Sequence, residues 1–290
     1  MGTCLGMAEL FDPAFLHELE ALNMALLRMR GRAGEGISRA GRSSGQTEFR
    51  GHRPYSMGDD VRRLDWNAYG RLGRMFVREF ERERREHLSI LLDRSKSMDA
   101  GSPAKHLFAR RIAAALGFLA LKGEGTAALY PEAAIEGVRR LNRWLDLLRA
   151  SEPNEARSLS DRLRELASMA RTPSDVVVIS DFMEPLAALE ALGALSERRC
   201  AVTLIQVLSP DEIAPQVRGT VDLAPCEEGG VLRMELDASS LGAYGVELGA
   251  HLEALETLAL RFGWTYALAP SDSDLRALFT GKLSAVGAGP

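Results

Sequence analysis

Apolar and polar positions along this chain form alternating blocks that predict a mixed α/β fold. Three segments, HLSILLD (87–93), DVVVISD (175–181) and CAVTLIQVL (200–208), are almost continuously apolar, which is typical of strands covered on both faces of a sheet. Apolar residues at three-to-four spacing predict helices over 103–121, 136–149, 158–171, 185–198 and 240–262. This alternation of strand and helix indicates right-handed crossovers and a mostly parallel sheet flanked by helices.

Shorter segments complete the predicted fold. TAALY (126–130) and WTYALA (264–269) predict two further strands, and 219–237 predicts a hairpin that turns at Glu228-Gly229-Gly230. We expect no internal repeat, because no block recurs at a fixed period.

The first 86 residues follow a different pattern. Phe15, Leu19 and Leu22 lie on one face of a predicted helix over 12–30, with Asp12 as its cap and Pro13 as its first residue. Residues 31–58 are rich in Gly, Ser and Arg and predict an extended loop, whereas the alternating RMFVREFERE (74–83) predicts a strand with one exposed face. We therefore divide the chain into an N-terminal helix with an arginine-rich segment, 1–86, and an α/β domain, 87–290.

Composition and charge narrow the classes of function. Hydrophobic residues make up 46% of the 290 residues, which is enough for a folded core, and the net charge of −4 gives no global attraction to nucleic acids or anionic membranes. No stretch reaches the roughly 18 apolar residues of a membrane span, and the N-terminus lacks the pattern of a signal peptide. Three scattered cysteines suggest reduced thiols. We expect a cytoplasmic protein.

Two of the buried strands end in aspartate. Asp93 follows LSILL and Asp181 follows VVVIS, so both carboxylates are expected at the carboxyl edge of the sheet, near the switch in strand order. Ser95 and Ser97 lie on the loop that leaves the first of these strands. Two carboxylates and two hydroxyls at one point form an oxygen site of the kind that Mg²⁺ or Mn²⁺ prefers.

Helix capping and phosphate ester hydrolysis are two alternatives to metal binding for these residues. Ser97 or Asp99 is equally suited to capping the helix that begins near Pro103, because Ser and Asp are favoured caps. A metal-dependent phosphoesterase would also place Asp93 at a strand end. A haloacid-dehalogenase-like phosphatase, however, needs a second acid two residues later, where this chain has Ser95.

The D-x-S-x-S-M motif at 93–98, together with the later Ser180-Asp181-Phe182, resembles the metal-ion-dependent adhesion site of von Willebrand factor A domains. Upstream, residues 48–83 are similar to the bacterial family known as domain of unknown function 58. Its signature is present here as Arg53, Tyr55, Gly58, Asp59, Asp60, Arg62, Asp65 and Trp66. The resemblance extends from about residue 40 to the end of the chain.

This resemblance implies a Rossmann-like, six-stranded A-type fold and a non-enzymatic accessory protein. It also implies two protein partners, a MoxR-type AAA+ ATPase and a client that is assembled, matured or activated. The residues of the expected metal site are Asp93, Ser95, Ser97 and Asp181. We expect binding through the carboxyl edge of the sheet, with no nucleic acid and no membrane span.

The second loop of the expected metal site departs from the family pattern. Relatives place a threonine before a leucine-containing helix, and aligning Leu159, Leu163 and Leu166 with that helix places Arg157 at the threonine position. The adjacent Ser158 is a possible substitute ligand. An inward-pointing Arg157 would repel a divalent cation, or would replace it by pairing with the two carboxylates.

The arginine-rich segment offers an alternative function. Residues 28–86 contain 15 arginines, no lysine and 9 acidic residues, with aromatic residues between them, a composition that also suits nucleic-acid binding. The interspersed acids favour a structural or partner-docking clamp instead, with Arg53 and Arg62 paired to Asp59 and Asp65. In this interpretation, Trp66 and Tyr55 pack against the domain core.

Overall fold

The computed structural model describes residues 10–34, 48–56, 64–81, 87–131, 133–153, 157–169, 174–198, 200–217, 219–223 and 232–283. The chain divides into two compact units, one formed by Met1–Met29 with Glu86–Pro290 and the other by Arg30–Arg85. The division at residue 86 placed the N-terminal helix with the arginine-rich segment. Contacts instead place most of this helix in the larger unit, because its apolar face is buried there.

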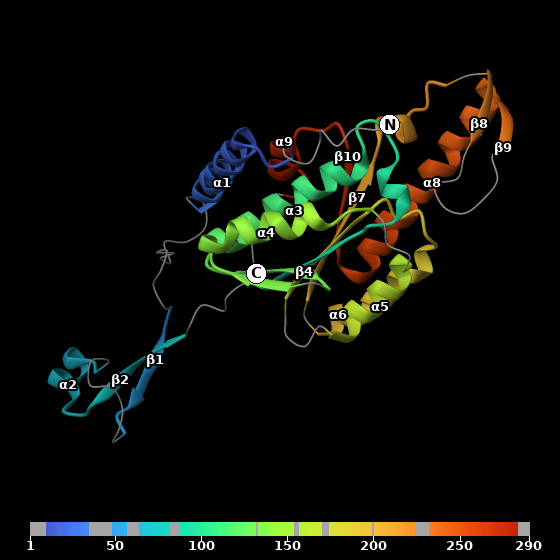
Figure 1. Cartoon of the computed structure of the whole chain (residues 1–290). Coiled ribbons are helices and arrows are strands. Elements are labelled where there is room, and N and C mark those ends of the chain that lie inside the picture. Colours follow the sequence, from blue (N-terminus) through green and yellow to red (C-terminus); the bar gives the residue numbers. More distant parts are fainter. Residues whose placement is uncertain are drawn as a thin grey trace. The chain divides into compact units, whose positions relative to one another are not determined.

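A six-stranded sheet forms the centre of the larger unit (Figure 1). Its strands lie in the order β10-β7-β6-β3-β4-β5, and all neighbouring pairs are parallel except β4 and β5. Their bounds are β3 (His87–Leu92), β4 (Thr126–Tyr130), β5 (Ala133–Glu136), β6 (Asp175–Ser180), β7 (Ala201–Leu208) and β10 (Thr265–Pro270). The predicted, mostly parallel sheet is confirmed. The sequence missed β5, because four residues give too short a period-two pattern.

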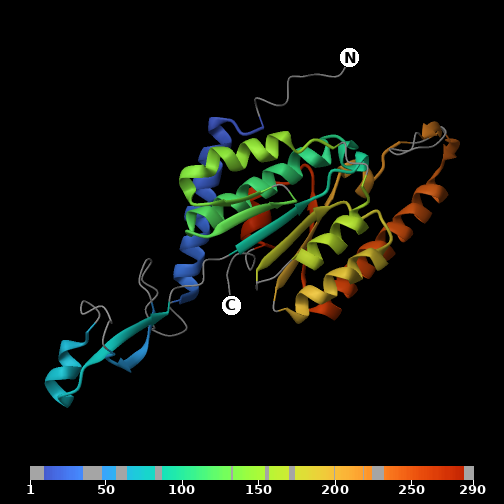
Figure 2. The same ribbon diagram turned by 60° about the horizontal axis from the view of Figure 1, so that its bottom comes forward.

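Helices cover both faces of this sheet, as predicted (Figure 2). One face carries α1 (Pro13–Gly34), α3 (Lys105–Lys122), α4 (Leu141–Ala150) and α9 (Leu275–Thr280). The other carries α5 (Leu159–Met169), the 3₁₀ helix η4 (Leu186–Leu192), α6 (Gly193–Glu197) and the C-terminal part of α8 (Ala238–Phe262). Alternate residues of β3 pack on opposite faces of the sheet. Ile90 and Leu92 lie in the core under α1, α3, α4 and α9, and Leu91 lies in the core under α5, η4, α6 and α8.

Helix α1 begins as the sequence predicted. The backbone N–H of Phe15 donates to Asp12 Oδ1 at 2.7 Å, so Asp12 satisfies one of the free amides of the first turn. Phe15, Leu19 and Leu22 are buried in the core that α3 also lines. Arg111 of α3 adds an ion pair of 2.7 Å with Glu18.

Helices α3 and α4 approach closely because of one glycine. A Cβ atom on Gly117 of α3 would lie 2.2 Å from the indole ring of Trp144 on α4. Trp144 is fully buried. Glycine is therefore the residue that this contact requires, because any larger side chain would overlap the ring.

The smaller unit is built on an antiparallel pair, β1 (Glu48–Pro54) and β2 (Phe76–Glu81), with α2 (Trp66–Leu72) between them in sequence. Strand β1 lies in the segment predicted to be a loop, since its glycine and arginine content concealed the strand pattern. Asp65 caps α2 by accepting from the Ala68 N–H at 3.0 Å. Trp66 is 64% exposed, and its expected packing against the domain core stays a prediction.

Several short elements connect the strands and helices of the larger unit. They are the 3₁₀ helices η2 (Lys96–Asp99) and η3 (Val138–Arg140) and the single-turn helix α7 (Pro210–Ile213). The predicted hairpin is confirmed as the antiparallel pair β8 (Gly219–Leu223) and β9 (Leu232–Leu236), although its predicted turn lies outside the described residues. Within the described ranges, no helix has the length and apolar character needed to cross a membrane.

Candidate functional site at the carboxyl edge of the sheet

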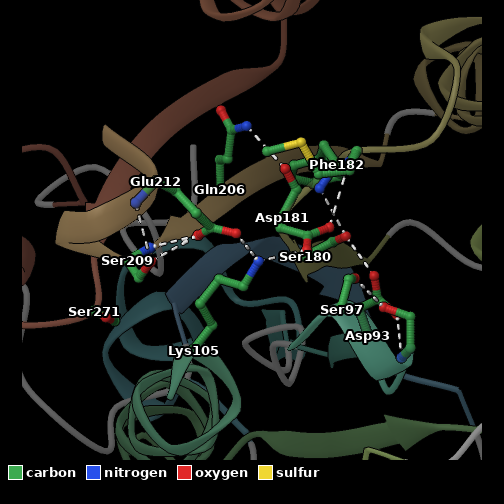
Figure 3. Close-up of polar contacts among 12 residues, drawn as sticks. Asp93, Ser97, Lys105, Ser180, Asp181, Phe182, Gln206, Ser209, Glu212 and Ser271 are labelled. Carbon is green, nitrogen blue, oxygen red and sulfur yellow. Dashed lines mark hydrogen bonds and ion pairs between the residues drawn. The ribbon is translucent and has the colours of Figure 1, made fainter. Parts of the chain in front are cut away.

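Asp93 and Asp181 follow the two strands on either side of the switch in strand order. After β3 the chain builds β4 and β5 on one side of it and then crosses to build β6, β7 and β10 on the other. Strands β3 and β6 are parallel neighbours, with Leu92 paired to Ile179, and the Asp93 N–H donates to the Ile179 carbonyl at 2.8 Å. The structure thus brings both aspartates to one edge, where open α/β sheets bind ligands (Figure 3).

Asp93 is buried and held by two hydrogen bonds. Its Oδ1 accepts from the Ser95 N–H at 2.9 Å, and its Oδ2 accepts from the Ser180 hydroxyl at 2.5 Å. Burial is the largest influence on Asp93 and raises its pKa above the usual 3.8, although both hydrogen bonds lower it. Nearby Asp181 adds to the increase in pKa, and Arg162 opposes it. The carboxyl group is thus fixed in position and poorly hydrated.

The two hydroxyls of the motif lie together. Ser95 Oγ and Ser97 Oγ are 2.9 Å apart, at the start of η2. Neither Ser97 nor Asp99 caps the following helix, because the N-cap residue of α3 is Ala104, which makes no side-chain cap. The capping hypothesis is therefore wrong, and the hydroxyls remain beside Asp93 in the same loop.

The turn after β6 is tightly constrained. Ser180 Oγ accepts from the Phe182 N–H at 3.0 Å, and Asp181 Oδ1 accepts from the Met183 N–H at 3.3 Å. Gln206 of β7 donates to the Asp181 carbonyl at 2.9 Å. Phe182 is buried with φ of +53°, a conformation that costs a residue other than glycine about 1–3 kcal/mol. The surrounding hydrogen bonds maintain this strained turn.

Lys105 is a member of the site that the sequence analysis missed. Its Nζ lies 2.8 Å from Asp181 Oδ2 and 2.6 Å from Glu212 Oε1, and its side chain is buried (Figure 3). A signal for it was present in the sequence, because Lys105 shares a helical face with Phe108 and Ile112. A lysine on the apolar face of a predicted helix requires a buried acidic partner.

The second loop of the expected metal site carries Arg157 and Ser158. Arg157 pairs with Glu165 at 2.5 Å and is half exposed, so its described ion pair does not involve Asp93 or Asp181. The hydroxyl of Ser158 accepts from the Asp161 N–H at 3.1 Å, which makes it a cap of α5. The proposed influence of Arg157 on a bound metal therefore stays a prediction.

Arg162 is the buried arginine of this region. Its Nη2 donates to the Leu92 carbonyl at 2.8 Å, one residue before Asp93, and only 2% of the residue is exposed. Glu184 further fixes this region, because its carboxylate accepts from the Leu159 N–H at 2.7 Å and from the Ser160 hydroxyl at 2.7 Å. The first turn of α5 is thereby tied to the loop after β6.

The family signature is only partly described. Asp65 is buried, Trp66 is exposed and Tyr55 is half-buried, with the Tyr55 N–H donating to the Met75 carbonyl at 2.9 Å. The side chain of Arg53 and the whole of Gly58, Asp59, Asp60 and Arg62 lie outside the described residues. The expected pairing of Arg53 and Arg62 with acids therefore stays a prediction.

The oxygen atoms at this edge meet the needs of a divalent cation only in part. Asp93, Ser95 and Ser97 supply a carboxylate and two hydroxyls from one loop, a set that fits Mg²⁺ or Mn²⁺ completed by water. Asp181 fits less well, because Lys105 already pairs with its Oδ2. In the described part of the chain, no group of three or more His, Cys, Asp or Glu residues is placed to hold a metal, so any such site depends on the hydroxyls.

Together these features define an α/β protein with a mostly parallel sheet flanked by helices and a polar site at the carboxyl edge of its central strands. Residues 51–245 match the family described as protein of unknown function DUF58. The chain belongs to this family.

Comparison with known proteins adds relatives but no activity. The uncharacterized protein Rv1480 of Mycobacterium tuberculosis is 29% identical over 214 residues, which cover 69% of this chain and 67% of the relative, and Mb1516 of Mycobacterium bovis matches equally. The conserved hypothetical protein BatB from Bacteroides thetaiotaomicron is 16% identical, with a TM-score of 0.43 over 70% of this chain and 100% of its own. An aerotolerance-related membrane protein from Bacteroides fragilis is 17% identical, with a TM-score of 0.40 over 67% and 97% of the two chains.

Proposed function

We propose that this chain is a non-enzymatic, von Willebrand factor A-like module that binds a protein partner through the carboxyl edge of its sheet. The partners would be a MoxR-type AAA+ ATPase and a client protein that is assembled, matured or activated in the cytoplasm. One observation carries the proposal: Asp93, Ser95, Ser97 and Asp181 come together at the switch point of the sheet, where this class of fold binds ligands. The choice of partner rests on the resemblance alone.

Mg²⁺ or Mn²⁺ would be held by Asp93, Ser95 and Ser97 and would accept a carboxylate oxygen from the partner. The residues of the chain itself prepare this site. Ser180 and the Ser95 N–H orient the Asp93 carboxylate, and Arg162 offsets part of its buried charge. Binding is favoured over phosphate ester hydrolysis, because Ser95 occupies the position where a dehalogenase-like phosphatase has its second acid.

The proposal is tested by the binding of a purified MoxR-type ATPase from the same organism, measured by biolayer interferometry in Mg²⁺ and in EDTA. We expect Asp93→Ala to weaken binding by about tenfold or more, because the central ligand is lost. Glu20→Ala is the matched control, since it removes the same charge from an exposed position on α1, beside Lys122 at the C-terminal end of α3. It should bind as the wild type does.

Equal binding by Asp93→Ala and wild type would exclude the carboxyl edge as the docking site. Binding that is lost in Asp93→Ala but unchanged by EDTA would retain the docking face and remove the divalent ion from the proposal. Thermal unfolding with Mg²⁺, Mn²⁺ and Ca²⁺ then measures ion binding by the free protein.

A further inference from the structure

Lys105 places a positive charge within the group of carboxylates at the sheet edge. Its ammonium is in contact with Asp181 Oδ2 at 2.8 Å and Glu212 Oε1 at 2.6 Å, and Asp181 directly follows β6, the strand next to β3 (Figure 3). Burial alone lowers the pKa of Lys105, but the two carboxylates raise it to above the usual 10.5. The side chain therefore stays charged at physiological pH.

The ammonium is held from several sides. Glu212 lies in α7, where it forms a capping box with Ser209: its Oε2 accepts from the Ser209 N–H at 2.8 Å. Tyr244 of α8 donates its hydroxyl to the Glu212 carbonyl at 2.7 Å. Gly101 packs so closely on Ser209 that a Cβ atom there would lie 2.4 Å from Ser209 Cβ. The acceptors of Lys105 are therefore fixed before any ligand arrives.

A divalent ion and this ammonium have opposing requirements. An ion that used Asp181 as an additional ligand would compete with the ammonium for its carboxylate, and two cations a few ångströms apart repel each other strongly in a poorly hydrated site. Asp93 does not share this conflict, since its Oδ1 and Oδ2 accept from the Ser95 N–H and the Ser180 hydroxyl. Asp93 is thus available to a metal ion, whereas Asp181 is already paired with Lys105.

We propose that Lys105 is the resident cation of this site, and that its ammonium and a divalent ion on Asp181 exclude each other. The inference rests on the proposed ion at Asp93 and specifies how that site is regulated. In the wild type the ion has only the loop of Asp93, Ser95 and Ser97 and binds weakly. Removing the ammonium frees Asp181 to become an additional ligand.

The test measures Mn²⁺ binding by electron paramagnetic resonance of the free ion, with no protein partner. Lys105→Met is expected to bind Mn²⁺ at least about tenfold more tightly than the wild type, because one repelling charge is lost and one carboxylate is gained. Lys122→Met is the matched control, since Lys122 lies at the other end of the same helix and pairs with Glu20 at the surface. Its affinity for Mn²⁺ should equal that of the wild type.

Equal Mn²⁺ affinity in Lys105→Met and wild type, including no binding by either, overturns the inference. So does a gain of the same size in Lys122→Met, because it would reflect net charge alone. These results are independent of the ATPase measurement. Failure of partner binding leaves the ion comparison intact, and failure of the ion comparison leaves the docking face intact.

Two further measurements apply if Lys105→Met does not fold. The double variant Lys105→Met/Glu212→Gln removes one of the two carboxylates left unpaired, and the same tenfold gain is expected. In the wild type, acetylation of Lys105 relative to Lys122 can be followed by mass spectrometry. Labelling of Lys105 that stays unchanged as Mn²⁺ saturates the protein supports an ammonium that remains on Asp181, whereas labelling that rises at saturation contradicts it, because the ion would then have displaced the ammonium.

Discussion

Ser180 and Asp93 are joined across two neighbouring strands by a hydrogen bond of 2.5 Å from the serine hydroxyl to Asp93 Oδ2. We expect Ser180→Ala to lower the free energy of unfolding by about 1.5–3 kcal/mol, because a buried carboxylate loses a donor and the Phe182 N–H loses an acceptor. Urea denaturation measures the change. Ser168→Ala, at an exposed position, should change stability by less than about 0.5 kcal/mol, and an equally small effect of Ser180→Ala would contradict the assigned role.

Arg162 and Arg157 are expected to differ sharply in their contribution to stability. Arg162→Met should lower the free energy of unfolding by about 3 kcal/mol or more, because a buried cation that supports Leu92 and offsets Asp93 is removed. Arg157→Ala should cost less than about 1 kcal/mol, since its ion pair with Glu165 is exposed. Denaturant unfolding of both variants tests this order. A larger loss of unfolding free energy in Arg157→Ala than in Arg162→Met would contradict the assignment of Arg162 as the arginine that supports the site.

His106 is expected to make stability depend on pH. Burial, followed by the charge of Arg110, lowers its pKa below 6.5, and Asp99 and Glu152 reverse only part of this change. The unfolded chain therefore takes up the proton at a higher pH than the folded protein does. The contribution of His106 to stability is therefore full at pH values above its pKa in the unfolded chain. It is lost as the pH falls towards its lower pKa in the folded protein.

The measurement compares wild type with His106→Asn in urea between about pH 8 and pH 5. The difference in unfolding free energy, wild type minus variant, should decrease as the pH falls. The other histidines cancel in this comparison, because both proteins contain them. A constant difference across the range would show that His106 is not held in its neutral form.

Two glycines of long helices are expected to respond in opposite directions to alanine. Gly117→Ala should lower the free energy of unfolding by about 1–3 kcal/mol, because its Cβ would overlap Trp144. Gly242→Ala on α8 has no atom within 4 Å of the new Cβ and should raise it by up to about 1 kcal/mol through helix propensity. Thermal unfolding of both variants measures the two shifts. A loss in Gly242→Ala would reveal a contact on that face of α8.

The sheet and the position of the aspartates were predictable from sequence because their signals are local. Continuous apolar runs marked β3, β6 and β7, and the polar residues that follow a parallel strand necessarily emerge at its carboxyl edge. The same logic failed at 185–198, where the apolar spacing predicted one helix. The structure has the 3₁₀ helix η4 and the single α-helical turn α6 there. Short 3₁₀ segments share the apolar spacing of α-helices over so few residues.

The charged residues of the site were not predictable in the same way. Lys105 and Arg162 both lie on apolar faces of helices. From the sequence pattern alone, a charged residue there indicates either that the helix prediction is wrong or that a partner lies elsewhere in the chain. Their partners lie 76 and 70 residues away along the chain. Arg157 was assigned by alignment to a loop position, and the direction of a loop side chain depends on contacts such as Glu165 that alignment does not contain.

The strained turn at Phe182 bears on the speed with which the proposed partner would bind. Its positive φ persists because Ser180 and Gln206 hold the N–H and the carbonyl of the peptide group between Asp181 and Phe182, so the edge would have its final shape before the proposed partner arrives. A rigid, preformed surface needs no slow rearrangement during encounter. Association should therefore proceed at the rates typical of orientation-limited docking, about 10⁵–10⁷ M⁻¹s⁻¹, and differences among partners should arise in their residence times.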